Sequence, residues 1–205
     1  MCIRDRVGIG FMFAQSHHAA MRHAAPVRRQ LGVRTIFNVL GPLSNPAGAT
    51  HQVLGVYAGA PMERLAEALG ALGVETAWVV RGQDGLDEMS PQGPTTVVKL
   101  QGGEVSSMEL SPSDFGLETV PTSALRGGDA QDNAEIIRRV LAGEPGAPRT
   151  AVLINAAAAL CVAGLVQSPK LGVARASAAI DSGAATELLQ RWVEHSQTAG
   201  STAAG

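Results

Sequence analysis

The chain has 205 residues, of which 45% are hydrophobic and 17% are charged. This composition excludes an intrinsically disordered chain, and the length suffices for one packed core with part of a second domain. The formal net charge of −2 excludes a general electrostatic attraction to nucleic acids or anionic membranes. Any anion binding must therefore come from a local cluster of basic residues.

Cysteine usage and hydropathy favour a cytoplasmic protein without a membrane partner. The two cysteines, Cys2 near the chain start and Cys161 in an Ala-rich segment, indicate neither a disulfide framework nor a cysteine metal site. The longest apolar segment, residues 151–166, is shorter than a bilayer span and contains Asn155. It predicts a buried helix in which the Asn155 amide hydrogen-bonds the backbone. We expect no secretory signal.

An apolar run leads into a segment rich in basic residues. Residues 7–14 have the continuous apolar character of a buried strand. Residues 17–46 then combine a terminal Gly-Pro turn with a group of cationic or titratable side chains, namely His17, His18, Arg22, His23, Arg28, Arg29 and Arg34. Pro26 divides the first part of this segment into two short predicted helices, and Gly32 ends the second.

Arg28 is the arginine that the helical spacing turns inward. Val27 and Leu31 form an i, i+4 apolar pair, and Arg28 lies beside that stripe, whereas Arg29 lies nearly opposite. An arginine beside an apolar stripe needs an anionic partner, and its planar group suits a carboxylate. That partner is either a ligand or an acidic side chain elsewhere in the fold.

From residue 51 the pattern alternates between strand and helix. The run VLGVYA is followed by the amphipathic PMERLAEALGALG and then by the apolar TAWVVRG. This order predicts a βαβ unit, and hence an α/β fold with a mostly parallel sheet flanked by helices. Ligands of such sheets bind beyond the carboxyl ends of the strands.

A loop with three acidic residues follows the second predicted strand of this unit. The run RGQDGLDEMSP places Asp84, Asp87 and Glu88 in a glycine-containing turn. Adjacent carboxylates at this position suit Mg²⁺, which prefers oxygen ligands and commonly keeps waters and substrate phosphates. The alternative is an acidic surface turn, because Asp-Gly pairs mark turns in many proteins.

The remaining chain predicts a hairpin and then helices. TTVVKLQ and EVSSMEL are strand-like runs joined by two glycines, which favours an antiparallel hairpin. The glycine-rich loop at residues 127–129 precedes a helix in which Asp132 and Glu135 form a predicted cap pair. Such a loop can bind phosphate, but we interpret it as structural. Further helices are expected at residues 134–142, 151–163, 171–180 and 186–195, and the small polar residues of 198–205 predict a disordered tail.

Two of these segments carry a resemblance to a known family. The run APVRRQLGVRTIFNVLGPLSNPA closely resembles the signature of anthranilate phosphoribosyltransferases, and GQDGLDE resembles the family's magnesium-binding loop. The resemblance implies a nucleoside phosphorylase/phosphoribosyltransferase-like fold with a remnant of a small helical domain. Residues 7–16 would be a strand of the α/β domain, 17–46 a helical hinge segment with the anthranilate site, and 47–197 the rest of the α/β domain. The diphosphate loop of the family is missing, so residues 1–6 are either a non-native start or an exposed native terminus.

The same resemblance assigns site residues. Arg28 would bind the carboxylate of anthranilate, Pro42 with Gly41 would lie against its ring, and Asp87 and Glu88 would hold Mg²⁺. His18 takes the place of the histidine in the family's HPAM turn, although Ala19 replaces the proline here. A substrate-pocket role and a capping or packing role both fit His18.

The activity that follows is transfer of phosphoribosyl from phosphoribosyl pyrophosphate to the amine of anthranilate, in tryptophan biosynthesis. The resemblance implies an Mg²⁺-dependent glycosyltransferase without an obvious general base, and a homodimer in the complete enzyme. Two alternatives remain. One is an inactive fragment that acts only as a structural or partner half, and the other is a nucleoside phosphorylase-like or nucleic-acid-binding relative.

Overall fold

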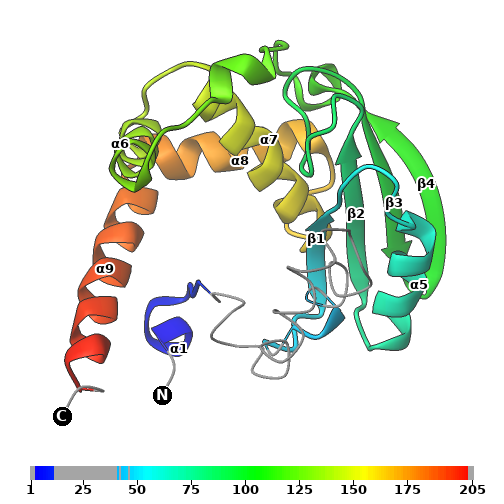
Figure 1. The fold of residues 1–205 in the computed structure, drawn as a ribbon, viewed down its shortest axis with the longest axis horizontal. Helices are drawn as coiled ribbons and strands as arrows, with labels where there is room; N and C mark the ends of the chain where they lie inside the picture. Colours follow the sequence, from blue (N-terminus) through cyan, green and yellow to red (C-terminus); the bar gives the residue numbers. More distant parts are fainter. Residues whose placement is uncertain (1–2, 12–40, 42, 46, 203–205) are drawn as a thin grey trace, which may run out of the picture.

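The computed structural model describes residues 3–11, 41, 43–45 and 47–202. In this part of the chain four strands form one sheet that has helices on both faces (Figure 1). One face packs against α5 (Met62–Ala71) and the other against α7 (Ala147–Val162). The expected α/β class is therefore confirmed.

The predicted βαβ unit is present. β1 (His51–Gly55) and β2 (Thr76–Gly82) run parallel, and α5 connects them. The helix buries its apolar face at an i, i+3, i+4, i+7 spacing, through Met62, Leu65, Ala66 and Leu69. Parallel strands place their carboxyl ends at one edge of the sheet, so Gly55 and Gly82 end there together.

The predicted hairpin is also present. β3 (Thr95–Gln101) and β4 (Glu104–Leu110) pair antiparallel, and the strand order is β1-β2-β3-β4 (Figure 1). Gly102 and Gly103 have φ angles of +59° and +84°, which residues with a β-carbon rarely adopt. Because β2 and β3 are also antiparallel, the described sheet is mixed, whereas we expected a mostly parallel sheet. Its parallel pairing is that of β1 with β2, since the hairpin adds its two strands antiparallel to this unit.

Alternation along the central strands divides the interior into two layers. Val79 of β2 and Val98 of β3 face α5, whereas Trp78 and Val80 face α7. β2 is therefore buried on both faces, which explains why TAWVVRG lacks the alternation of a half-exposed strand. The layer under α7 also contains the ring of Phe115, which is 1% exposed.

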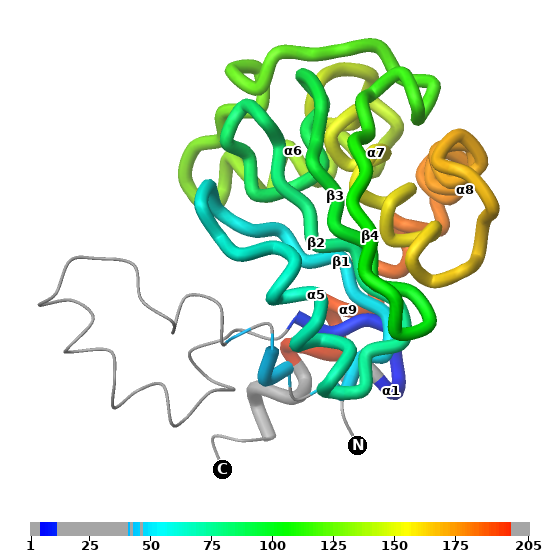
Figure 2. The backbone as a smooth tube through the Cα atoms, turned by 90° about the vertical axis from the view of Figure 1, so that its right-hand side faces the viewer, coloured from blue at the N-terminus to red at the C-terminus, as the bar shows by residue number. Residues whose placement is uncertain are grey.

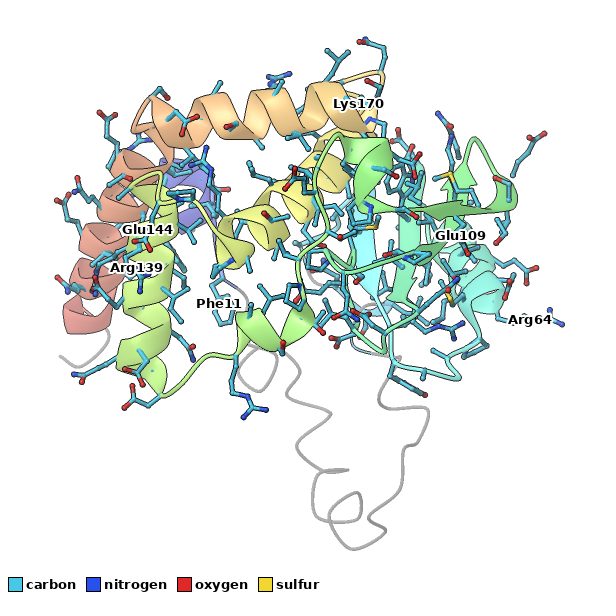
Figure 3. All side chains as sticks on the ribbon, turned by 90° about the horizontal axis from the view of Figure 1, so that it is seen from above. Phe11, Arg64, Glu109, Arg139, Glu144 and Lys170 are labelled. Atoms are coloured by element: carbon cyan, nitrogen blue, oxygen red, sulfur yellow. The ribbon has the colours of Figure 1, made fainter. Side chains whose placement is uncertain are left out.

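Four helices follow the hairpin. They are α6 (Ala130–Leu141), α7, α8 (Pro169–Asp181) and α9 (Ala184–Thr202). Two short 3₁₀ helices, η1 (Pro112–Phe115) and η2 (Thr122–Leu125), lie between the hairpin and α6. α8 packs closely on α7, because a β-carbon at Gly172 would lie 2.8 Å from the β-carbon of Ala157. Figure 3 shows the side chains of Arg139, on α6, and Glu144, in the loop that follows α6, close together, and Arg139 donates two hydrogen bonds to Glu144.

Two details of these helices differ from expectation. The cap pair of α6 is Asp129 with Asp132, one turn before the predicted pair of Asp132 and Glu135. The prediction was wrong because the helix begins at Ala130, and Glu135 instead pairs with Arg138 on the helix surface. α9 continues through Thr202, so residues 198–202 are helical where we expected a disordered tail.

The N-terminal strand is not found in the described residues. Residues Ile3–Val7 form a short helix, α1, which lies against α9 (Figures 1 and 2). Residues 8–11 form no strand, and none of the four strands pairs with them. Val7 is buried, but Ile9 and Phe11 are 42% and 72% exposed. Without a neighbouring strand an apolar run has no partner for its backbone groups.

None of the helices in the described ranges is long and apolar enough to cross a membrane.

Candidate functional site

The predicted metal-binding residues lie in the loop of residues 83–94 that connects β2 to β3, which we call the β2–β3 loop. The loop turns sharply at its start, because the amide of Gly82 donates to the carbonyl of Leu86 at 2.8 Å and that of Gly85 to Gly82 at 3.1 Å. Gly85 has a φ angle of +95°, which explains the glycine in Asp-Gly-Leu. The loop therefore projects from the carboxyl end of β2.

Asp84 holds this loop together. Its carboxylate accepts hydrogen bonds from the amide of Leu86 at 3.2 Å and from the hydroxyl of Ser90 at 2.8 Å. Ser90 is fully buried, and its own amide donates to the hydroxyl of Thr95 at 2.9 Å. Of the three acidic residues, Asp84 thus stabilises the loop through hydrogen bonds of its carboxylate.

Asp87 and Glu88 have a different environment. Both residues are exposed, and within the described part of the chain neither carboxylate has a hydrogen bond or an ion pair. Part of the Glu88 carboxyl group is nevertheless shielded from water. This partial burial, followed by the neighbouring charge of Asp87, raises the pKa of Glu88 above its ordinary value. Two adjacent and unneutralised carboxylates are a favourable position for a cation.

The donor set fits Mg²⁺ better than a softer metal. Both candidate ligands are carboxylate oxygens, and no group of three or more His, Cys, Asp or Glu side chains suited to a metal occurs among the described residues. An ion held by Asp87 and Glu88 would therefore take its remaining ligands from water or from a bound substrate. Mg²⁺ commonly binds in this way, through one or two carboxylates and the phosphates of a substrate.

Gly55 explains how the loop comes so close to the sheet. A β-carbon at Gly55 would lie 1.7 Å from the carbonyl oxygen of Asp87 and 2.8 Å from its carbonyl carbon. The last residue of β1 must therefore be glycine for the Asp87 backbone to pack against it. Our sequence reasoning did not identify Gly55, although a glycine interrupting the apolar run VLGVYA is a signal of close backbone approach.

Asn155 reaches the same loop from α7. Its side-chain oxygen accepts a hydrogen bond from the amide of Met89 at 3.0 Å, and its nitrogen donates to the carbonyl of Met89 at 3.2 Å. The same nitrogen also donates to the carbonyl of Ala151 at 3.0 Å. The prediction that the Asn155 amide hydrogen-bonds the backbone is confirmed.

The predicted anthranilate-binding residues lie mostly beyond the part of the chain that the structure describes. Arg28, His18 and Pro42 are outside the described residues, so their roles stay predictions. Gly41 is described and half-buried, and its carbonyl accepts a hydrogen bond from the amide of Ser44 at 3.2 Å.

The glycine-rich loop before α6 fits its structural interpretation. The amide of Gly128 donates to the Asn133 side chain at 3.2 Å, and the amide of Asp129 donates to Asp132 at 3.2 Å. The amides that would bind a phosphate are therefore already paired within the loop.

A cavity of about 640 Å³ lies away from the carboxylates. Its walls include His51 and Thr76, the first residues of the two parallel strands, together with Trp78 and Lys99. The cavity is thus at the amino ends of β1 and β2, opposite the β2–β3 loop. It contains neither Asp87 nor Glu88 and belongs to a different region of the sheet.

Similarity to known proteins extends over most of the chain. The model of the glycosyl transferase family, a/b domain, matches residues 2–186. The chain belongs to this family. Within the family, this glycosyl transferase domain is 52% identical over 189 residues to an anthranilate phosphoribosyltransferase of Parvibaculum lavamentivorans. That match covers 92% of the chain and 55% of the relative, so the chain spans about half the length of the curated relatives it matches.

Solved structures agree with this glycosyl transferase assignment. The anthranilate phosphoribosyltransferase of Thermus thermophilus superimposes with a TM-score of 0.83 at 44% identity, over 92% of this chain and 56% of that one. The enzyme of Saccharomyces cerevisiae in complex with PRPP and Mg gives a TM-score of 0.78 at 34% identity, over 86% and 51%. The same yeast enzyme has been solved in complex with 4-fluoroanthranilate. The resemblance to anthranilate phosphoribosyltransferases is thereby confirmed.

Proposed function

We propose that this glycosyl transferase domain contributes to Mg²⁺-dependent transfer of phosphoribosyl from phosphoribosyl pyrophosphate to the amine of anthranilate. The observation that carries the proposal is the pair of exposed carboxylates, Asp87 and Glu88, which lie at the carboxyl end of the parallel strands and have no partner among the described residues. The Saccharomyces cerevisiae relative, whose structure contains PRPP and Mg, supports the choice of substrate and metal.

Asp87 and Glu88 would hold the metal ion. Bound Mg²⁺ supplies positive charge that stabilises the departing pyrophosphate. Partial burial and the neighbouring charge of Asp87 raise the pKa of Glu88, so the charged form of its carboxyl group is disfavoured when no cation is present. A bound cation would stabilise that charged form. The remaining ligand positions stay open to phosphate oxygens and water.

Arg28, Pro42, Gly41 and His18 would form the anthranilate side of the site. The guanidinium of Arg28 suits the carboxylate of the substrate, since both groups are planar and can form two parallel hydrogen bonds. Pro42 and Gly41 would offer an apolar surface to the aromatic ring, and His18 would line the pocket. In this arrangement Arg28 orients the amine toward the sugar carbon that loses pyrophosphate.

The proposal is tested by following the loss of anthranilate fluorescence with phosphoribosyl pyrophosphate and Mg²⁺. The 205-residue chain is assayed alone and together with the portion of the Parvibaculum lavamentivorans enzyme that it does not match. We expect turnover in at least one of the two mixtures. No turnover in either would favour an inactive fragment or a relative with another substrate.

The active mixture then identifies the metal ligands. Replacing both acids, Asp87→Asn with Glu88→Gln, should lower the rate about 100-fold or more, since a metal ion is worth several kcal/mol of transition-state stabilisation. The control is Glu104→Gln with Glu118→Gln, which removes the same charge from two other exposed positions. Equal rates in both double variants would remove Asp87 and Glu88 from the site.

A further inference from the structure

We propose that Asn155 is a positioning residue for the metal site, acting on Asp87 and Glu88 through the backbone of Met89. The inference rests on the proposed function, because it assumes that these two carboxylates hold the ion. It adds a residue from α7, 66 positions away from Met89 along the chain, to a site otherwise built from the β2–β3 loop.

The side-chain amide of Asn155 has the chemistry that this role needs. Asn155 accepts from the Met89 amide and donates to the Met89 carbonyl, so it satisfies both backbone groups of one residue. Only a side chain with an acceptor and a donor next to each other can do this. The further bond to the carbonyl of Ala151 holds the amide plane in one orientation relative to its own helix.

Asn155 is attached to a rigid part of the molecule. It lies in the middle of a helix of 16 residues, beside Ile154, which is 1% exposed. Ala157 and Ala158, one turn further on, are fully buried in the same core. Met89 is also fully buried in that core. The hydrogen bonds therefore join the loop to a part of the molecule that cannot move without disturbing packed side chains.

Met89 directly follows the two acidic residues in the loop. Its amide nitrogen belongs to the peptide group that begins with the carbonyl of Glu88, so Asn155 fixes the plane of that peptide. On the other side, the Asp87 carbonyl packs against Gly55. The backbone of both acidic residues is thus held from two directions, while both residues remain exposed.

A backbone held in this way favours metal binding. Two neighbouring carboxylates repel each other, and a free loop would turn them apart when no cation is present. A backbone fixed at Gly55 and Met89 limits how far the two carboxylates can separate, so less order is lost when the ion binds. Loss of Asn155 should therefore weaken metal affinity even though Asn155 does not contact the ion.

A matched control exists on α6. Asn133 forms the same pair of bonds with Gly128, accepting from its amide at 3.2 Å and donating to its carbonyl at 3.0 Å. It differs in being more exposed and in serving the loop before α6, which carries no predicted metal ligand. Asn133→Ala therefore removes equivalent hydrogen bonds without touching the β2–β3 loop.

The test measures the affinity of the 205-residue chain for Mn²⁺, by electron paramagnetic resonance, as a probe of the Mg²⁺ site. The variants are Asn155→Ala, Asn155→Leu, Asn133→Ala and the double variant Asp87→Asn with Glu88→Gln. Asn155→Leu nearly preserves the side-chain volume, so it replaces Asn155→Ala if the alanine variant does not fold. The unfolding temperature without metal is recorded for each.

We expect either Asn155 variant to weaken Mn²⁺ binding by about 10- to 100-fold, the range typical of residues that orient metal ligands. Asn133→Ala should bind Mn²⁺ like the parent chain. Parent-like binding by the Asn155 variants, with binding lost in the double variant, would overturn the inference and leave the proposed function intact. Equal weakening by Asn155→Ala and Asn133→Ala would also overturn it, because the effect would then be general destabilisation. Parent-like binding by the double variant would overturn the metal site itself.

Discussion

The substitution Gly55→Ala tests the contact between β1 and the β2–β3 loop. A β-carbon at this position would lie 1.7 Å from the carbonyl oxygen of Asp87, whereas real β-carbons essentially never approach another atom within 3.0 Å. The two segments must therefore separate by about 1.3 Å. Gly55 is paired with Val80 in the parallel register, and the next amide, that of Val56, donates to the Val80 carbonyl at 3.0 Å. Because β1 is held by these bonds, we expect the loop to move.

Two quantities should respond. Overpacking of this kind costs about 1 to 3 kcal/mol, which for a chain of this size lowers the unfolding temperature by about 2 to 12 °C. Displacement of the Asp87 backbone should also weaken Mn²⁺ binding, since it moves the carboxylate that we propose as a metal ligand. Thermal unfolding followed by circular dichroism measures the first effect, and paramagnetic resonance measures the second.

Gly93→Ala is the matched control for this prediction. Gly93 lies in the same loop, its β-carbon position has no neighbour within 4 Å, and its φ angle is not in the left-handed region. We expect this variant to melt and to bind Mn²⁺ like the parent chain. If Gly55→Ala and Gly93→Ala behave alike in both measurements, the packing of Asp87 against β1 is refuted.

Two further substitutions have opposite pH dependences. The folded state raises the pKa of Glu88, so its charge opposes folding above that pKa, and Glu88→Gln should raise the melting temperature of the metal-free chain at pH 7. The gain should vanish below the ordinary pKa of glutamate. A gain of the same size at pH 7 and below that pKa would contradict the prediction. Hydrogen bonds from Arg149, then from Ser177, lower the pKa of Asp181, so Asp181→Asn should lower the melting temperature at pH 7. This loss should disappear as the pH falls through the depressed pKa; a loss that persists there would exclude the charge as its cause.

Local signals in the sequence were sufficient for much of the fold. The apolar runs on either side of the amphipathic PMERLAEALGALG, and the two glycines between TTVVKLQ and EVSSMEL, predicted a βαβ unit and a hairpin that the structure confirms. These features depend on side-chain periodicity and backbone freedom, which a short segment determines by itself. A strand in residues 7–14 would need a neighbouring strand to pair with, and a local sequence pattern cannot predict whether such a neighbour is present.

The candidate site divides in the same way. The sequence by itself determined the acidic pair Asp87 and Glu88, and the turn that presents it, because both depend on neighbouring residues in one loop. Only the tertiary structure decided that Asp84 is engaged with Ser90, that Gly55 receives the Asp87 carbonyl, and that Asn155 binds Met89. The last two contacts join residues from different elements, and their distances depend on how a strand, a loop and a helix pack around a shared core. Such distances follow from the arrangement of the whole domain, since no periodicity within one segment records them.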